Sequence, residues 1–472
     1  MCNCCVQTVP PGSSYKAFGD PVKHWEARLT AGLDRILQAS DESLGHIEEE
    51  IGQKTRELQR HVAEEAAQKK ADQCPPNCPI CGTKLRRVTH GHERTIQTRF
   101  GPIRLKRGRG WCPHCKRWCF PADHLLGIAE TGSASPGVQE MAALLGSKMP
   151  ITEASAVIQR LTGVDLSRPT LDREAKRQGG RAERKRDKLD EEMRTAEGAR
   201  TQGQGSSNTP FTLVIEIDAW NIRERDDWGK SQRKRAQGQE PERWHWVYGA
   251  TCFRLEDRIT KGDRALILSR GTVMTRGGIE ALKNQLWAEA TRHGLANAAR
   301  VLVLADGAVW IWNLVADRFE KAVQRLDLYH ANEHLWSVAR ALHPEDHGAA
   351  ETWVKPLLQD LKRDRAREVI ATLENLVEGM QGSARELVKK EINYFGSNQA
   401  RMKYKEGKKR GEPLGSGAIE STCRQYQCRF KRPGQFWSRE GDEALICLET
   451  FWRNGRWHIL FPHAALSDLS KN

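Results

Sequence analysis

The sequence predicts a multidomain protein of the α/β class. At 472 residues the chain is too long for one compact core. A polar linker rich in Gly, Ser, Gln and Asn lies at 199–210, and apolar runs of strand length alternate with helical segments after it, from 211 to 330. Upstream of the linker, two Cys-x-x-Cys pairs flank a strand-like stretch. These observations predict a sheet-based domain after the linker and smaller domains before it.

Charge favours an anionic partner. The formal net charge is +14. The segment 84–110 holds nine Lys or Arg residues against one acid, and 401–440 holds eleven against four. Such concentrated patches are typical of proteins that bind a polyphosphate. No apolar run is long enough to span a bilayer, and the first residues lack the pattern of a signal peptide, so we expect a cytoplasmic protein that does not bind membranes.

The N-terminal region 1–73 has apolar residues at three- and four-residue spacings among charges, which predicts a helical hairpin for packing or dimerisation. The chain has 13 cysteines and no secretory signal, which favours free thiols or metal ligands over a disulfide framework.

The region 74–135 has the pattern of a zinc ribbon. "CPIC" and "CPHC" are separated by 30 residues with strand-like alternation, and two such turns close a tetrahedral zinc site at the ends of a β-hairpin. The predicted ligands are Cys78, Cys81, Cys112 and Cys115. Other nearby residues are alternative ligands or buried neighbours, namely Cys74, Cys119, His90, His92 and His114. The basic strands between the pairs, with Arg104, Lys106 and Arg107, would then lie on DNA.

The region 136–198 has the layout of a helix-turn-helix. The first helix is expected to end near Leu161, Gly163 permits the turn, and Ser167 caps the second helix. The side chains then exposed on the second helix are Thr170, Arg173, Lys176 and Arg177. A plain helical pair is the alternative, and the cysteine pairs and basic charge upstream favour DNA binding.

Two acids stand where strands are expected to end in the domain that follows. "FTLVIEIDAW" is a strand with Asp218 at its end and Glu216 on the same face, and "ARVLVLADG" is a buried strand followed by Asp306. Between these two strands we expect a second strand at 244–255, a third around 264–273, and then a helix at 279–294. If the first and fourth strands of this series are neighbours, the two carboxylates lie side by side and require a cation, for which Mg²⁺ is suited. The alternative is that Asp218 is a cap and Asp306 belongs to an Asp-Gly turn.

A short strand at 325–328 then leads into a helix and carries Asp327 and His330 in an Asp-x-x-His spacing. The residues 331–412 are predicted to be a helical insertion. In "PLGSGAIEST" the glycines make a turn and Glu420 falls in the first turn of a new helix. The glycine spacing does not indicate a dinucleotide site, because no strand directly precedes it and the third glycine is missing. A simple helix cap is the remaining alternative.

Together these segments resemble the DDE transposases of bacterial insertion sequences, most closely the ISKra type, with kinship to the Mutator-like group. The segments that carry the resemblance are "CPIC…CPHC", the helix-turn-helix, "IEIDAW", "LADGAVWIW", "DLYHANEHLW", "GSGAIEST" and "CRFKRPGQFW". The resemblance covers nearly the whole chain. It implies a ribonuclease-H-like catalytic domain formed by 211–330 and 413–472, with the helical insertion between them.

The resemblance also implies the catalytic residues. Two divalent ions, Mg²⁺ or Mn²⁺, would be held by an Asp, Asp, Glu set that corresponds to Asp218, Asp306 and Glu420. His330 would position the scissile phosphate, and the accessory residues would be Glu216 and Asp327. Residues after Glu420 would grip phosphates or stack on a displaced base, namely Arg424, Arg429, Lys431, Arg432 and Trp437.

The implied activity is hydrolysis of a DNA strand at a transposon end, followed by attack of the freed 3′-hydroxyl on target DNA. The implied partners are double-stranded DNA at the transposon ends and at the target, and a second copy of the chain in a dimer or larger assembly, near the bacterial nucleoid. Two competing accounts remain. One is an inactive or domesticated transposase that acts as a zinc-containing DNA-binding protein, and the other is a metal-dependent nuclease of the same fold.

Overall fold

A computed structural model of the chain describes residues 43–195, 209–225, 230–238, 243–261 and 264–462, with single positions between 27 and 38. The chain divides into two compact units, each with its own core. The first comprises residues 1–146 and 150–174, and the second comprises 147–149 and 175–472. Most of the predicted linker and of the first 42 residues lies outside the described ranges.

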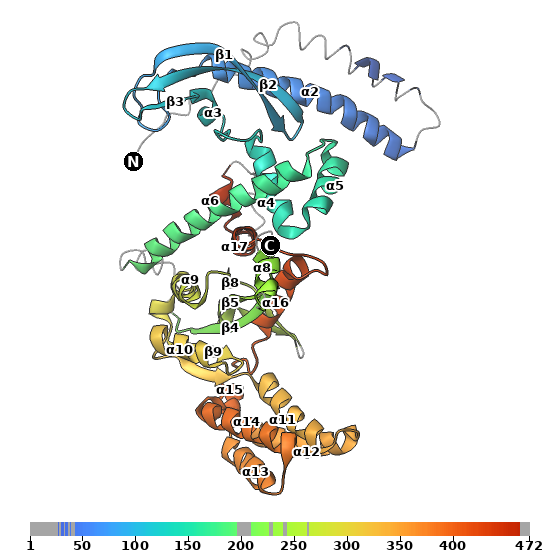
Figure 1. Cartoon of the computed structure of the whole chain (residues 1–472), viewed down its shortest axis with the longest axis vertical. Coiled ribbons are helices and arrows are strands. Elements are labelled where there is room, and N and C mark those ends of the chain that lie inside the picture. Colours follow the sequence, from blue (N-terminus) through green and yellow to red (C-terminus); the bar gives the residue numbers. More distant parts are fainter. Residues whose placement is uncertain are drawn as a thin grey trace. The chain divides into compact units, whose positions relative to one another are not determined.

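The first unit contains a three-stranded antiparallel sheet in the order β1-β2-β3, formed by Arg86–Thr98, Gly101–Cys112 and Arg117–Cys119 (Figure 1). Alternate residues of β2 are buried, because one face of the strand packs on a core with Ile96 and Leu105. The long helix α2 (Leu44–Asp72) packs along β2, and the short helix α3 (Pro121–Leu125) also contacts that strand.

Three further helices follow the sheet: α4 (Pro136–Lys148), α5 (Ile151–Thr162) and α6 (Arg168–Arg194). Helix α5 ends at Gly163, whose φ of 65° is readily adopted by glycine. Leu171 of α6 packs with Ile158 of α5 in a small core. The helix bounds therefore follow the turn residues read from the sequence.

The second unit is built on a mixed five-stranded sheet with the order β10-β9-β4-β5-β8. Its strands are Thr212–Arg223 (β4), Trp244–Arg254 (β5), Gly271–Thr275 (β8), Arg300–Ala305 (β9) and Val323–Leu326 (β10). β4, β5 and β8 form an antiparallel meander, whereas β9 and β10 run parallel to β4. The first and fourth strands of the series are therefore neighbours.

Two strands differ from expectation. β4 continues to Arg223, so Asp218 lies within the strand instead of at its end, because pairing with β5 extends to Trp244. The predicted third strand is split: Arg264–Ile267 (β7) pairs with Arg258–Lys261 (β6) in a separate hairpin, and only β8 joins the sheet. The turn residues at 268–270 separate β7 from β8.

The two faces of the sheet have different neighbours. On β4, Leu213, Ile215 and Ile217 belong to the main core, with residues of α9 (Ile279–Arg292), α10 (Val309–Arg318) and α11 (Leu328–Leu342). Val214 belongs to a smaller cluster with Phe253, against which Ala418 of α16 (Gly417–Phe430) packs. Because side chains alternate along a strand, Glu216 and Asp218 lie on the same face as Val214, toward α16.

The predicted helical insertion is formed by α12 (His347–Lys362), α13 (Ala366–Glu378), α14 (Gly382–Asn398) and α15 (Tyr404–Lys409). Helices α11 to α14 gather into one group on the β9 side of the sheet, where β10 is the edge strand (Figure 1). Their buried residues, among them Leu335, Leu357 and Phe395, extend the main core. In the described ranges, no helix is both long enough and apolar enough to cross a membrane.

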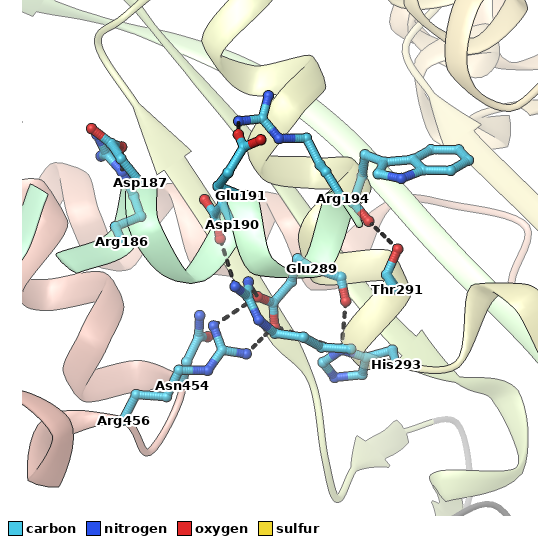
Figure 2. Close-up of polar contacts among 12 residues, drawn as sticks. Arg186, Asp187, Asp190, Glu191, Arg194, Glu289, Thr291, His293, Asn454 and Arg456 are labelled. Carbon is cyan, nitrogen blue, oxygen red and sulfur yellow. Dashed lines mark hydrogen bonds and ion pairs between the residues drawn. The ribbon is translucent and has the colours of Figure 1, made fainter. Parts of the chain in front are cut away.

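A buried ionic network joins α6, α9 and the segment before α18 (Trp457–Leu460) (Figure 2). Glu289 accepts two hydrogen bonds from Arg456, at 2.6 and 2.8 Å, and a third from Arg292 at 3.1 Å. Arg292 also pairs with Asp190 of α6 at 2.7 Å. Burial alone would raise the pKa of Glu289, but Arg456 and its other cationic neighbours lower it below its usual value. The network therefore fixes the second half of α6 to this unit.

α6 also packs on α17 (Arg439–Arg453), where Gly179 is so close to Ala444 that a Cβ would overlap with it. On the same side, Arg186 pairs with Glu443 at 2.7 Å. Glu443 in turn accepts a hydrogen bond from Thr275 at the end of β8, at 3.0 Å. The sheet, α17 and α6 are thus connected by buried polar contacts.

Candidate active site and metal centre

The pairing of β4 with β9 places Asp218 and Asp306 at the same level. Glu216 is opposite Leu304 in the last pair of this parallel ladder, and Asp218 and Asp306 each stand two residues further along. Neighbouring strands are about 4.8 Å apart, so residues in this position have adjacent side chains. The electrostatic effect of Asp306 on Asp218 agrees with this, because the Asp306 carboxylate raises the pKa of Asp218.

Several groups act on Asp218. Burial raises its pKa most, the backbone N–H of Ala219 lowers it through a 2.7 Å hydrogen bond, and Asp306 raises it. The thiol of Cys423 lies close enough to this carboxylate to lower its pKa. The net effect is a raised pKa, which means that the negative charge on Asp218 lacks full compensation from the protein. A cation at this place would provide it.

Asp306 directly follows β9 and its backbone is fixed from two sides. Its carboxylate accepts a hydrogen bond from the N–H of Ala308 at 2.9 Å. Its carbonyl accepts one from the hydroxyl of Tyr394, on α14, at 2.9 Å. Gly307 has φ 97° and lies against the Tyr394 ring, where a Cβ would come within 2.9 Å. The helical insertion therefore helps to hold the turn that carries Asp306.

The segment "PLGSGAIEST" crosses close to the start of α11. Its Leu414 carbonyl accepts from the N–H of Leu328 at 2.9 Å. Gly415 lies against the Tyr329 ring so closely that a Cβ would overlap with it. Ser416 donates to Asp327 through both its N–H, at 2.5 Å, and its hydroxyl, at 2.6 Å. These contacts fix the turn from which α16 begins, and they explain the glycine at 415.

Glu420 lies one turn into α16. Its N–H donates to the Ser416 carbonyl at 3.1 Å, and the Ser416 hydroxyl is 3.5 Å from its carboxylate. Glu420 and Asp218 both act electrostatically on Cys423, which follows Glu420 by three residues on the same helix. Arg424 is 3.8 Å from Glu420 and its side chain is 80% exposed. The half-buried Glu420 therefore shares its surroundings with Asp218.

Two further carboxylates lie beneath this site and hold backbone groups. Glu216 is 2% exposed and accepts from the N–H of Ile419 at 2.9 Å. Burial raises the pKa of Glu216 to about 8, although backbone N–H groups at the start of α16 lower it. Asp327 is fully buried and, besides Ser416, accepts from the N–H groups of Tyr329 and His330. Glu216 thus caps α16, and Asp327 caps α11.

His330 stands in the first turn of α11, beside the two aspartates. The charge of His330 lowers the pKa of Asp218, so it stabilises the ionised form of that carboxylate. Its side chain is 35% exposed, and Nδ1 is 3.6 Å from Glu333. The structure therefore brings His330 to the same site as Asp218 and leaves it accessible.

The carboxylates have the chemistry of a site for hard divalent cations. Asp218, Asp306 and Glu420 offer oxygen atoms and are half-buried; Asp306 acts electrostatically on Asp218, and both Asp218 and Glu420 act on Cys423. These three acids do not form a compact ligand cluster. Within the described ranges, cysteines form the one set of possible ligands whose atoms all lie within 4.8 Å of one another. In a two-metal site the ligands are divided between ions about 3.5–4 Å apart, so such a compact single cluster is not required.

Cysteines form a second, compact cluster in the first unit. Cys78, Cys81, Cys112 and Cys115 have sulfur atoms within 4.8 Å of one another, and this set can hold a metal such as zinc. Backbone N–H groups, first that of Cys81, lower the pKa of Cys78 to about 6, whereas hydrogen bonding with Cys81 and burial raise that of Cys115 to about 12. Four such thiols cannot all ionise together without a cation.

The buried Cys119 is a fifth sulfur, 3.9 Å from that of Cys78. Its position on β3 makes it a neighbour of the cluster. All ten cysteines in the described ranges are free thiols, as expected from the composition.

The basic residues predicted to contact DNA fall into two groups. Those that are exposed or half-exposed are Arg104, Lys106, Thr170, Arg173, Lys176, Arg177, Arg424, Lys431 and Arg432. Arg107 is buried instead, pairs with Asp123, and lies 4.0 Å from the Phe120 ring centroid. It is therefore a packing residue of the ribbon.

Arg429 and Trp437 are also buried, at 6% and 8% exposure. Arg429 lies over the Trp437 ring at 4.8 Å, and the indole N–H donates to the carbonyl of Phe430 at 2.8 Å. A ring in this position is not available to a base. The helical periodicity of α16 did not predict the burial of Trp437, because this residue lies beyond the end of the helix. Trp437 forms an isolated β-bridge with Glu224, the residue that follows β4.

Sequence reasoning missed three residues at the carboxylates: Cys423, Ser416 and Tyr394. Cys423 stands three residues after Glu420, so helical spacing could have placed it on the same face. Ser416 binds Asp327, and the spacing between these two residues in the sequence gives no sign of this contact. Tyr394 comes from a helix whose position depends on tertiary packing, and no local pattern marks it.

No protein-family model matches the chain. The chain is similar to a protein of Streptococcus gallolyticus named "UPF0236 protein in vanSb 3′region". The two are 22% identical over 378 residues, which cover 79% of this chain and 75% of that protein. The similarity thus extends over most of both chains.

Proposed function

We propose that this protein is a DDE transposase that binds the ends of an insertion sequence, cleaves a DNA strand there and joins it to target DNA. Two observations support the proposal: the pairing of β4 with β9 sets Asp218 and Asp306 at the same level, and Asp218 and Glu420 both act electrostatically on Cys423 of α16. The sheet order β10-β9-β4-β5-β8 supports a ribonuclease-H-like fold for this unit, since it makes the two acid-bearing strands neighbours.

The residues fit a pair of divalent cations. The pKa of Asp218 is raised by burial and by Asp306, so the site has a deficit of positive charge that a cation would remove. Magnesium ions bound here would activate the attacking oxygen and stabilise the charge of the phosphate in transfer. The side chains that would hold them are Asp218, Asp306 and Glu420.

The other residues position these ligands or the DNA. Tyr394 holds the backbone of Asp306, and the Ser416–Asp327 contacts hold the turn before Glu420. His330 is near enough to Asp218 to affect its charge and is partly exposed, so it can contact a phosphate bound beside the carboxylates. Cationic side chains on the exposed part of α16, such as Arg424, would attract the DNA backbone.

The zinc cluster would have a different role. Four thiolate ligands leave no position for a reacting water, so a zinc ion there would stabilise the ribbon fold and take no part in strand cleavage. The exposed Arg104 and Lys106 on β2 would then present positive charge on a rigid hairpin to DNA.

The test is a cleavage and joining assay with the full chain, Mg²⁺, and DNA that carries the sequences flanking the gene. Asp306→Asn should reduce both reactions at least about 100-fold. Glu280→Gln is the matched control, because Glu280 is an exposed carboxylate on α9 that pairs with Lys283. It should retain the activity of the unmodified protein.

The outcomes separate the competing accounts. Cleavage and joining by Asp306→Asn at the unmodified rate would reject the proposed site. Cleavage without joining would indicate a nuclease. Specific binding of the flanking DNA with neither reaction would indicate an inactive or domesticated protein.

A further inference from the structure

An exposed aromatic surface lies at the far end of β4 and β5. It consists of Trp244, Trp246 and Phe436, with the cationic residues Arg223, Arg225 and Lys431, and we call it the aromatic face. Trp244 is 48% exposed, Trp246 54% and Phe436 36%. Exposed tryptophans are costly, since burying an aromatic side chain stabilises a protein. Two exposed tryptophans and an exposed phenylalanine together mark a binding surface.

The two tryptophans point to the same side of the sheet. They are two residues apart on β5, and side chains on a strand alternate. Trp244 is opposite Arg223 on β4, and Trp246 is opposite Asn221. The β4–β5 ladder is continuous through these pairs, so the backbone holds both rings in place.

Cations lie around these rings. The guanidinium of Arg223 is 4.4 Å from the Phe436 ring centroid and 5.9 Å from that of Trp244. The ammonium of Lys431 is 5.6 Å from the Trp244 ring and donates to Asn221 at 2.8 Å. Arg225 is 5.8 Å from Phe436. Glu224, an acid near the face in the described part of the chain, is buried and paired with Arg276, so its own charge does not cancel that of the face.

The aromatic face is connected to the carboxylates by two elements. β4 carries Asp218 and reaches Arg223 five residues later, a distance of about 16 Å along a strand. α16 carries Glu420 in its first turn and ends just before Lys431, about 16 Å further along its axis. The two tryptophan rings lie on the other side of the β4–β5 ladder from Asp218, because Asn221 and Arg223 stand three and five residues after it on β4.

We propose that the aromatic face binds unpaired nucleotides of a DNA strand. Flat rings of Trp and Phe can stack on any base, and the surrounding cations attract the phosphates, which is the combination that single-stranded nucleic acid requires. A duplex keeps its bases stacked inside, so the rings would gain little from it. The identification of DNA as the ligand rests on the proposed function. The stacking residues would be Trp244, Trp246 and Phe436, and not the buried Trp437.

The test measures binding without catalysis. The full chain is titrated with a labelled single-stranded oligonucleotide of 12 to 20 nucleotides in EDTA, and fluorescence anisotropy gives Kd. A second oligonucleotide of the same length has abasic sites throughout, and therefore keeps the phosphates and lacks the bases. The unmodified protein should bind the first more tightly than the second.

The double variant Trp244→Ala/Trp246→Ala should weaken binding of the base-containing strand by roughly 10-fold or more and leave the abasic strand nearly unchanged. Trp244→Phe/Trp246→Phe should retain most of the preference, because the rings remain. The control is Ile259→Ala/Leu266→Ala, a pair of exposed apolar residues opposite each other on the β6–β7 hairpin, which should bind as the unmodified protein does.

The proposal would be overturned if the Trp244→Ala/Trp246→Ala variant lost affinity equally for both oligonucleotides or lost no affinity at all. An equal loss of affinity in the Ile259→Ala/Leu266→Ala control would also overturn it. A tighter complex with duplex of the same sequence would assign the face to paired DNA and would overturn it too. The titration is done in EDTA, so it depends on no divalent metal ion and on no strand cleavage. Failure of the aromatic face is therefore distinguishable from failure of the cleavage assay.

Discussion

The cysteine cluster and the carboxylate site differ in how far apart their residues lie in the sequence. The cysteines all come from one hairpin, and Cys78 and Cys115 are 37 residues apart. The carboxylates come from β4, the end of β9 and α16, so that Asp218 and Glu420 are separated by more than 200 residues. A local site can be predicted from spacing, whereas a distributed site depends on the order of the strands.

The two sites also differ in exposure. Cys112 and Cys78 are almost completely buried, as befits ligands that close around a structural ion. Asp218, Asp306 and Glu420 are all half-buried. A site that acts on a substrate must remain partly open, and the buried support comes from Glu216 and Asp327 instead.

The largest effect is expected from removing a cysteine ligand. Cys112→Ser should abolish zinc binding and unfold the ribbon, because zinc contributes on the order of 10 kcal/mol to small zinc domains. The measurements are zinc content and limited proteolysis of the first unit. Cys74→Ser is the control and should keep its zinc. A Cys112→Ser protein with full zinc content would show that this cysteine is not a ligand.

A smaller loss of stability is expected in the second unit. Glu289→Ala leaves Arg292 and Arg456 buried without their shared carboxylate, so the free energy of unfolding should fall by about 3–5 kcal/mol. Because the folded protein lowers the pKa of Glu289, this contribution is present at neutral pH and is lost as acid protonates the carboxylate. Urea unfolding measures it.

Glu280→Ala, on the exposed side of the same helix, should change the unfolding free energy by less than about 0.5 kcal/mol. Equal changes in the unfolding free energy for Glu289→Ala and Glu280→Ala would mean that the ionic network in Figure 2 stabilises the protein no more than a surface ion pair does.

The support of the carboxylates can be weakened without touching a ligand. Ser416→Ala removes the hydroxyl bond to Asp327 and leaves the backbone bond, so strand cleavage should fall roughly 10-fold while the fold is kept. The loss should be partly recovered at higher Mn²⁺ concentration. Ser421→Ala, an exposed serine on α16, should be unaffected. A Ser416→Ala protein with full activity and unchanged metal dependence would exclude this positioning role.

The smallest effect concerns a buried acid distant from both sites. Burial, followed by the charge of Glu224, raises the pKa of Asp442 to about 8. The folded protein therefore binds this proton more tightly than the unfolded chain, and raising the pH from about 4 to 8 reduces stability. Asp442→Asn removes the charge, so it should stabilise the protein by on the order of 1 kcal/mol more at pH 8.5 than at pH 5. An equal effect of Asp442→Asn on the free energy of unfolding at both pH values would contradict the raised pKa of Asp442.

Much of the fold could be predicted from local patterns. The strands β4, β5 and β9, the helix α9 and the helical insertion all follow from apolar runs and helical spacing. Gly163 predicted the end of α5 because glycine adopts positive φ readily. The prediction that Asp218 stands at the end of its strand was wrong, because β4 continues to Arg223 through its pairing with β5. The β6–β7 hairpin was missed for the same reason.

The site could be predicted only in part. The three carboxylates were predicted as metal ligands from apolar runs, a helix start and a resemblance, and they stay a prediction. The burial of side chains such as Arg107 and Trp437 depends on contacts made after folding. The exposure of Trp244 and Trp246 likewise cannot be read from β5, because the strand also contains apolar residues that are fully buried, such as Val247.

The most direct test of the central claim is the number of Mn²⁺ ions bound in the presence of DNA with the flanking sequences, measured by electron paramagnetic resonance. The unmodified protein should bind two ions per chain, as a two-metal site requires. Asp218→Asn, Asp306→Asn and Glu420→Gln should each lose at least one ion while keeping the zinc cluster. An unchanged number of Mn²⁺ ions in all three variants would contradict the assignment of these residues as metal ligands.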